Sequence, residues 1–248
     1  RIVANRKDWS GHWGVSQVLN KNALLSGGFS YTRSTGYLSN PYKNVTFLFK
    51  DPNQVHSVYP EDVYVAELIN AQENRPGERN QFAWDLRYVQ YITPLDAALH
   101  VNYRLFNDDW GILAHTLEAS WDQPLGHGWS VTPKIRYYSQ DAADFYQPMF
   151  NFNQLKPKTA TGIDYGKLPI QYFSSDHRLS GYGALSGGLS FTKVFAKGIS
   201  FDAGVEYYTH SGALKLGGGG EDAYADFDYY LVNAGFRVDL SALSLSGS

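Results

Sequence analysis

Residues 199–208 read ISFDAGVEYY, and this stretch decides the fold class. Its odd positions are mostly apolar, whereas its even positions include Asp202 and Glu206. A period of two is the period of a β-strand, because successive side chains of a strand point to opposite faces of the sheet. The stretch therefore predicts a strand with one apolar and one polar face.

The same alternation recurs along most of the chain. The runs that show it are 9–20, 25–32, 81–92, 99–105, 113–122, 129–138, 179–191, 199–209 and 230–240. Nine strands are so predicted, and most have ten to thirteen residues, about twice the average length in soluble proteins and about the length that crosses a bilayer when tilted. Pro133 cannot donate to a sheet ladder, so a local bulge or break is expected there.

Charged side chains fall on the polar faces, often in the middle of a run. The residues expected to line this face are Asp85, Arg87, His100, Arg104, Glu118, Asp122, Lys134, Arg136, Asp202, Glu206 and Arg237. In a soluble sandwich the polar faces are outside and the apolar faces pair as a core. In a membrane barrel the polar face lines the lumen and the apolar face meets lipid. Alternation alone does not distinguish the two.

Strand length and two further features favour the membrane barrel over the soluble sandwich. Tryptophans lie near the ends of the apolar runs, where interfacial girdles would be: Trp9, Trp84, Trp110, Trp121 and Trp129. Short connections, such as 21–22 and 123–128, largely alternate with long segments at 35–80 and 141–178. Short periplasmic turns and longer extracellular loops give that pattern. The fold predicted is an all-β, antiparallel transmembrane β-barrel.

The direction of the runs bears on the strand number. With short turns on the periplasmic side, the first and ninth runs both travel inward, whereas single-chain barrels usually have an even number of strands and both termini in the periplasm. We therefore expect residues 1–248 to form one barrel domain whose N-terminal part is missing, with at least nine strands here and ten or more in the full protein. The tail 241–248 lacks a terminal aromatic residue.

Composition excludes several other classes. The chain has no Cys, so disulfide frameworks, thiolate zinc sites and thiol catalysis are ruled out. A net charge of −3 without a basic stretch argues against nucleic-acid binding. No apolar run approaches the ~20 residues of a spanning helix, and the mean hydropathy of −0.36 averages two different faces. No cofactor and no metal is expected.

Three motifs carry a resemblance to a known family. They are RPGER at 75–79, YRLFNDDWG at 103–111 and IRYYSQDAADFY at 135–146. Together they resemble a longer family of predicted bacterial outer-membrane proteins catalogued only as a domain of unknown function, of which this chain corresponds to the C-terminal majority. The resemblance implies a bacterial outer-membrane location. Neighbouring genes in that family, for small lipoproteins and redox proteins, imply a lipoprotein or redox partner.

Two loop motifs allow a catalytic or ion-binding interpretation. Asp176 and His177, beside Ser174 and Ser175, suggest a rim hydrolase, but adjacent residues on a strand face opposite ways and could not act together. The run 217–220, followed by acidic residues, suggests a calcium or phosphate loop. No helix is predicted after it to hold phosphate, and the acids lack calcium spacing, so a flexible extracellular loop is preferred. An enzyme is not expected.

The long segments hold the remaining candidates. Short β-like runs at 45–49 and 63–69 predict a hairpin within 35–80, either projecting above the membrane or folding inward. Aromatic residues of the second segment are either partner contacts or a cap over the mouth: Phe145, Tyr146, Phe150, Phe152 and Tyr172 among them.

The residues thus predict an outer-membrane barrel in contact with lipid that acts as a pore for small polar solutes. The alternative is a plugged barrel that anchors a lipoprotein or a periplasmic or surface protein, because paired charges could fill a narrow lumen.

Overall fold

The computed structural model describes residues 4–57, 62–159, 162–196, 198–222 and 225–239. Nine strands form one antiparallel sheet in the order β1-β2-β5-β6-β7-β8-β12-β13-β14. Their bounds are β1 Arg6–Asn20, β2 Ala23–Gly36, β5 Glu78–Ile92, β6 Ala97–Asp108, β7 Leu113–Gly126, β8 Trp129–Gln140, β12 Tyr182–Ala196, β13 Ile199–Ser211 and β14 Phe227–Val238. The nine predicted strands are confirmed; the expected end of the last one, Leu240, lies outside the described residues.

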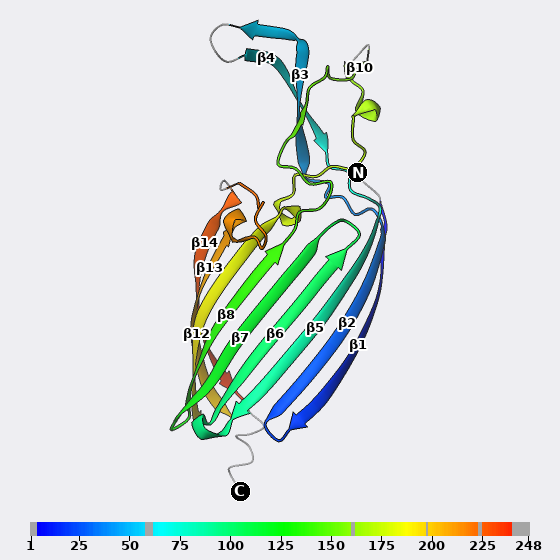
Figure 1. Cartoon of the computed structure of the whole chain (residues 1–248). Coiled ribbons are helices and arrows are strands. Elements are labelled where there is room, and N and C mark those ends of the chain that lie inside the picture. Colours follow the sequence, from blue (N-terminus) through cyan, green and yellow to red (C-terminus); the bar gives the residue numbers. More distant parts are fainter. Residues whose placement is uncertain (1–3, 58–61, 160–161, 197, 223–224, 240–248) are drawn as a thin grey trace.

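Strand neighbours in the sheet are also neighbours along the chain, apart from the insertions before β5 and β12. The sheet curves into a barrel wall (Figure 1). β1 and β14 both run from the end that carries the long connections, here called the loop end, to the opposite turn end. Within the described chain each of these edge strands pairs on one side only.

Tight connections close the turn end. The β7–β8 turn places Gly126, His127 and Gly128 at positive φ, and a Cβ on Gly128 would collide with the carbonyl oxygen of Val194. Between β5 and β6, the 3-10 turn η1 (Thr93–Leu95) ends in Asp96 at φ 47°. The described residues contain no helix with the length and apolarity needed to cross a membrane.

Pro133 interrupts one ladder without deforming its strand. β8 pairs with β12 without a break from Trp129 to Gln140, so the expected bulge or break is absent on that side. On the β7 side the paired positions skip from Ser120 to Gln123 at constant register. A proline has no N–H to give to the ladder, and the interruption is confined to the side where that donor is missing.

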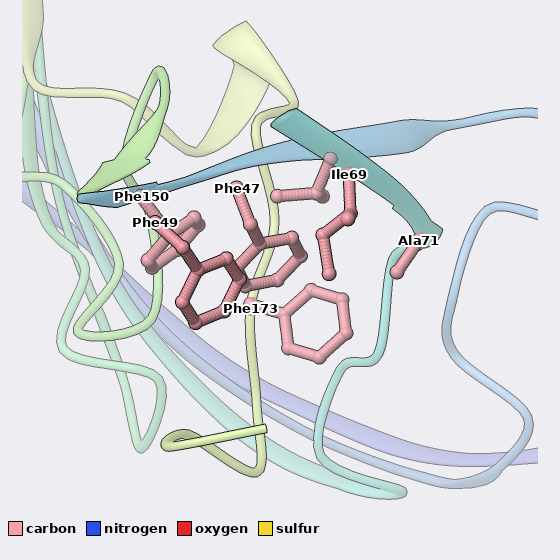
Figure 2. Packing of buried hydrophobic residues seen from close by; sticks show 7 residues of the cluster. Phe47, Phe49, Ile69, Ala71, Phe150 and Phe173 are labelled. Atoms are coloured by element: carbon pink, nitrogen blue, oxygen red, sulfur yellow. The ribbon is translucent and has the colours of Figure 1, made fainter. Parts of the chain in front are cut away.

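The insertion between β2 and β5 forms the predicted hairpin, β3 (Asn44–Ser57) and β4 (Asp62–Gln72), which projects beyond the loop end (Figure 1). β9 (Phe150–Phe152) adds a parallel strand to β3. Phe47 and Phe49 are buried against Ile69, Phe150 and Phe173 (Figure 2). The hairpin therefore has its own hydrophobic core, completed by the segment between β8 and β12.

That second segment crosses the loop end as irregular structure. It contains β10 (Lys158–Thr159), β11 (Gly162–Ile163), η2 (Tyr165–Lys167) and η3 (His177–Leu179), while η4 (Gly212–Leu214) lies in the β13–β14 connection. A second cluster of buried residues joins Ala143, Phe145 and Leu179 to Trp110 and Ile112 of the β6–β7 turn. We call this the mouth cluster, because it closes over the loop ends of β6 and β7.

Candidate functional site

The eleven charged or ionisable residues predicted to line the lumen all share one face of the sheet. Cross-strand partners share a face, and the register links the residues from strand to strand: Asp85 aligns with Arg104 and Glu118 with Arg136. The same alignment continues through β12 to Glu206 and Arg237. A cavity of about 530 Å³ on this face is bordered by residues of β1, β2, β5, β6, β7 and β8, among them His12, Arg87 and Glu118. This hollow spans six neighbouring strands, whereas a hollow of about 570 Å³ beside Trp13 and Trp84 on the apolar face spans four, so the polar face is the concave face.

Part of the charge on the concave face is neutralised by neighbours. Arg104 donates to Asp85 at 2.9 Å, His100 lies 3.0 Å from Asp122, and Lys134 lies 3.3 Å from Glu118. Asp202 accepts a hydrogen bond from Thr192. Within the described chain, four of the predicted residues form no side-chain hydrogen bond or ion pair: Arg87, Arg136, Glu206 and Arg237. The wall thus combines paired and unpaired charges of both signs.

The convex face has the opposite character. Trp13, Leu117, Ile135 and Val232 are exposed on it, in the middle of their strands. Charged residues on outward-facing positions of the nine described strands occur only near the ends: Lys7, Arg33, Glu78 and Asp228 at the loop end and Lys193 at the turn end. An apolar band bordered by charges therefore surrounds the wall.

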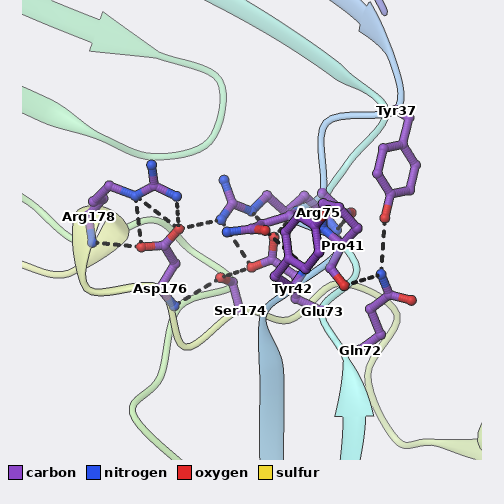
Figure 3. Close-up of polar contacts among 11 residues, drawn as sticks. Tyr37, Pro41, Tyr42, Gln72, Glu73, Arg75, Ser174, Asp176 and Arg178 are labelled. Atoms are coloured by element: carbon purple, nitrogen blue, oxygen red, sulfur yellow. Dashed lines mark hydrogen bonds and ion pairs between the residues drawn. The ribbon is translucent and has the colours of Figure 1, made fainter. Parts of the chain in front are cut away.

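A buried ion network fixes the mouth. Arg75, just after β4, lies 2.8 Å from Glu73 and 2.7 Å from Asp176, and Arg178 also contacts Asp176 (Figure 3). Ser174 donates to Glu73 at 2.6 Å. Burial alone would raise the pKa of Asp176, but hydrogen bonds from Arg178 and Arg75 hold that pKa well below its usual range. The network ties the end of the hairpin to the segment between β8 and β12.

Trp110 belongs to the mouth and not to a lipid-facing girdle, so that prediction was wrong. Its ring is 3% exposed, its Nε1 donates to the carbonyl oxygen of Glu78, and Arg79 lies over it at 4.4 Å. Asp108 accepts from Arg79 and from the backbone N–H groups of Trp110 and Ile112. The β6–β7 turn folds inward around this carboxylate and carries the tryptophan with it.

Most of the aromatic residues proposed as partner contacts are used within the chain. Phe145 and Tyr146 are buried in the mouth cluster, and Phe150 is buried in the hairpin core, against which Phe152 packs. Tyr172 is the exposed member, at 39%. Four of these five aromatic residues thus pack within the chain, as a cap over the mouth would, while a partner contact by Tyr172 stays a prediction.

The rim residues do not form a hydrolytic set. The carboxylate of Asp176 faces Arg75 and Arg178, whereas Nδ1 of His177 lies 2.9 Å from Oε1 of Glu221. Ser174 is fully buried on Glu73. The described residues contain no group of three or more His, Asp and Glu side chains arranged to hold a metal.

Sequence reasoning missed an aromatic group on the concave face. Tyr138, Tyr182, Tyr208 and Tyr229 lie on four adjacent strands and border a cavity of about 290 Å³ together with Arg136 and Glu206. The signal was present as the doublets at 137–138, 207–208 and 229–230. A doublet in a strand must place one ring on each face.

The curved antiparallel sheet, with its polar concave face and apolar convex face, defines a β-barrel of the outer-membrane type. Within this class, the chain belongs to the family described as "Protein of unknown function (DUF3570)", whose model matches residues 2–231. The family resemblance inferred from the three motifs is confirmed.

Two further comparisons complete this result. A search of curated proteins gives no match. Among solved structures, the chain is similar to OmpT, an outer membrane protein of Vibrio cholerae folded in vitro, with a TM-score of 0.48 and 9% identity. The similarity covers 93% of this chain and 55% of OmpT, so the chain spans little more than half the length of that protein.

Proposed function

We propose that the chain forms the wall of a channel for small polar solutes in the bacterial outer membrane. In this proposal the convex apolar band contacts lipid, and the concave face lines the water-filled lumen. The observation that carries the proposal is the inner wall itself, with cavities of about 530, 290 and 480 Å³ and the unpaired Arg87, Arg136 and Glu206 along it. A wall meant only to fill a barrel would have its charges paired, because an unpaired charge costs free energy when it loses water.

The balance of charge favours weak ion preference. Five cationic residues, Arg87, Arg104, Lys134, Arg136 and Arg237, face five acidic ones, Asp85, Glu118, Asp122, Asp202 and Glu206. Such a lumen suits neutral or zwitterionic solutes, since neither sign of ion gains a net attraction.

Reconstitution of the full protein in a planar bilayer tests the proposal. Discrete conductance steps are expected, together with swelling of liposomes in small neutral solutes. A protein that is correctly folded and inserted but gives no current above background would refute the channel.

A second candidate function is an anchor for a surface partner, and the projecting hairpin favours it. A cavity of about 640 Å³ lies at the hairpin base between β4 and the segment that includes η2, bordered by Asn70, Gln72 and Leu168. β4 pairs only with β3 among the described strands, so its other edge is open to added chain. Native purification should then retain a lipoprotein or other partner. A barrel that is recovered alone each time would count against this function.

A further inference from the structure

The inner wall near the mouth contains a trough: small residues of one strand form its floor, and large side chains of the two neighbouring strands form its sides. On β12 the concave positions are Ala184, Ser186 and Gly188. The register places Tyr138 and Arg136 beside them on β8, and Tyr208 and Glu206 on β13. Because β8 and β13 are two strand spacings apart, the sides of the trough are separated by about 10 Å.

The aromatic side chains of the trough support one another. The ring of Tyr182 lies 5.6 Å from that of Tyr138 and 4.1 Å from that of His210, and Tyr208 stacks on Tyr229 at 5.0 Å. His210 is buried and stacks on Phe227. Tyr182 and Tyr208 each contact two other rings, and rings that are already held by neighbours lose little conformational entropy when a ligand packs against them.

The trough contains two side chains of opposite charge, Arg136 and Glu206, that form no ion pair or side-chain hydrogen bond within the described chain. The guanidinium of Arg136 is a donor only, the carboxylate of Glu206 is an acceptor only, and neither has a side-chain partner within the described chain. An anion bound by Arg136 would be repelled by Glu206, and a cation bound by Glu206 would be repelled by Arg136. A neutral ring with several hydroxyl groups satisfies both, since each hydroxyl donates and accepts.

We propose that this trough binds a neutral sugar ring, with its C–H face against Tyr208 and its hydroxyl groups on Arg136 and Glu206. Small residues on the floor leave space for the ring, and the tyrosines supply the apolar contact that a polyhydroxylated molecule needs. The inference rests on the proposed function in one respect, namely that this face lies inside the barrel. If so, neutral sugars are the class of solute that the channel carries.

Binding is measured on the full protein in detergent by calorimetry, with maltose and maltotriose as neutral probes and gluconate and phenol as competing classes. We expect saturable binding of the neutral sugars. Tyr208→Ala should weaken it about 3- to 10-fold, the range expected for loss of one aromatic contact. Ser186→Leu should weaken it by filling the floor while every aromatic ring remains. Tyr207→Ala, on the opposite face of the same strand, should leave the affinity within about twofold of wild type, because its ring does not reach the trough.

Several results would overturn the inference. These are absence of saturable sugar binding by the folded protein, equal affinity in Tyr208→Ala and Tyr207→Ala, or preferential binding of gluconate or phenol. The channel is tested separately by conductance. If the protein binds sugar but gives no conductance, the sugar site stands and the channel is rejected. If it conducts, but binds no sugar and its conductance does not change when sugar is added, the channel stands and the sugar site is rejected.

Discussion

The guanidinium of Arg75 lies 2.7 Å from the carboxylate of Asp176, although the two residues are 101 positions apart in the chain. Both side chains are largely buried. This contact joins the two long insertions above the barrel mouth, since Arg75 follows the hairpin and Asp176 precedes η3. This ion network therefore adds to the β3–β9 pairing and the shared hydrophobic core in holding the two insertions together.

Replacing Asp176 with Asn should loosen the cap, which is the segment between β8 and β12 that lies over the mouth. Arg75 keeps Glu73 as an anionic partner, so the variant loses the charge-assisted hydrogen bonds of Asp176 without leaving a bare buried charge, and a local loss of about 1.5–3 kcal/mol is expected. Hydrogen exchange should rise in residues 141–178 while the barrel strands stay protected. Lys167→Ala is the control, because its pair with Asp164 is exposed and contributes well under ~1 kcal/mol. Unchanged exchange in Asp176→Asn would contradict the role of the network.

The same carboxylate sets a pH dependence. Its folded pKa is held far below the ordinary value of 3.8, so its contribution to stability is fully present above about pH 4 and is lost as the pH falls through the folded pKa. Protection of the cap, corrected for intrinsic exchange rates, should be equal at pH 7 and pH 4.5. In Asp176→Asn the cap should be weak at both. A wild-type cap that opens by pH 4.5 would show that another group controls it.

A charge in the apolar band should disturb membrane assembly, whereas the same charge on the concave face should not. Leu117→Arg places a cation against lipid, at a cost of about 2–4 kcal/mol near the midplane. Ser120→Arg, on the other face of β7, adds an equal charge between Glu118 and Asp122 of the same strand, in register with His100 and Lys134 of the neighbouring strands. Insertion into lipid vesicles, followed by gel mobility of the folded barrel, compares the two variants. Equal insertion would argue against lipid contact on the convex face.

The unpaired charges of the wall should set ion selectivity. Arg136→Gln removes a cation and should shift the reversal potential toward cation preference, and Glu206→Gln should shift it toward anion preference. The double variant should return close to the wild-type value, because the net charge is restored. Shifts of the same sign in both single variants would exclude a lumen position for at least one of them.

The hairpin core should be energetically local. Phe47→Ala opens a cavity in a fully buried aromatic cluster and should cost the hairpin about 3–5 kcal/mol. Limited proteolysis should then cut within 44–72 while the barrel strands survive. The exposed Leu68→Ala is the control on β4. Loss of the whole barrel in Phe47→Ala would show that hairpin and barrel fold as one unit.

Alternation predicted the sheet well because every barrel strand has two different surroundings. Asp85 and Trp84 are adjacent in the chain yet face opposite sides, and their residue types alone reveal this. The hairpin was also predicted from its two short apolar runs, but whether it projects or folds inward was not. Pro133 was less predictable, since its effect depends on which neighbour needs the missing N–H, and that requires the register.

The contacts at the mouth could not be predicted from a two-residue alternation. Arg75 and Asp176 carry no periodic signal, and Trp110 has the sequence context of a girdle residue although its turn folds around Asp108. The concave tyrosines were visible as doublets, but their convergence at one trough needed the alignment of β8, β12 and β13. Sequence therefore assigns a residue to a face more readily than to a neighbour on another strand.

The common direction of β1 and β14 limits how the wall can be completed. Two copies inserted with the same orientation would bring β1 of one against β14 of the other, and these edges would meet in parallel. An antiparallel seam in the same membrane instead requires an odd number of intervening strands, at least one of which runs from the turn end to the loop end. If a single strand filled that gap, it would pair with β1 on one side and β14 on the other, so its own residues would decide whether the passage closes.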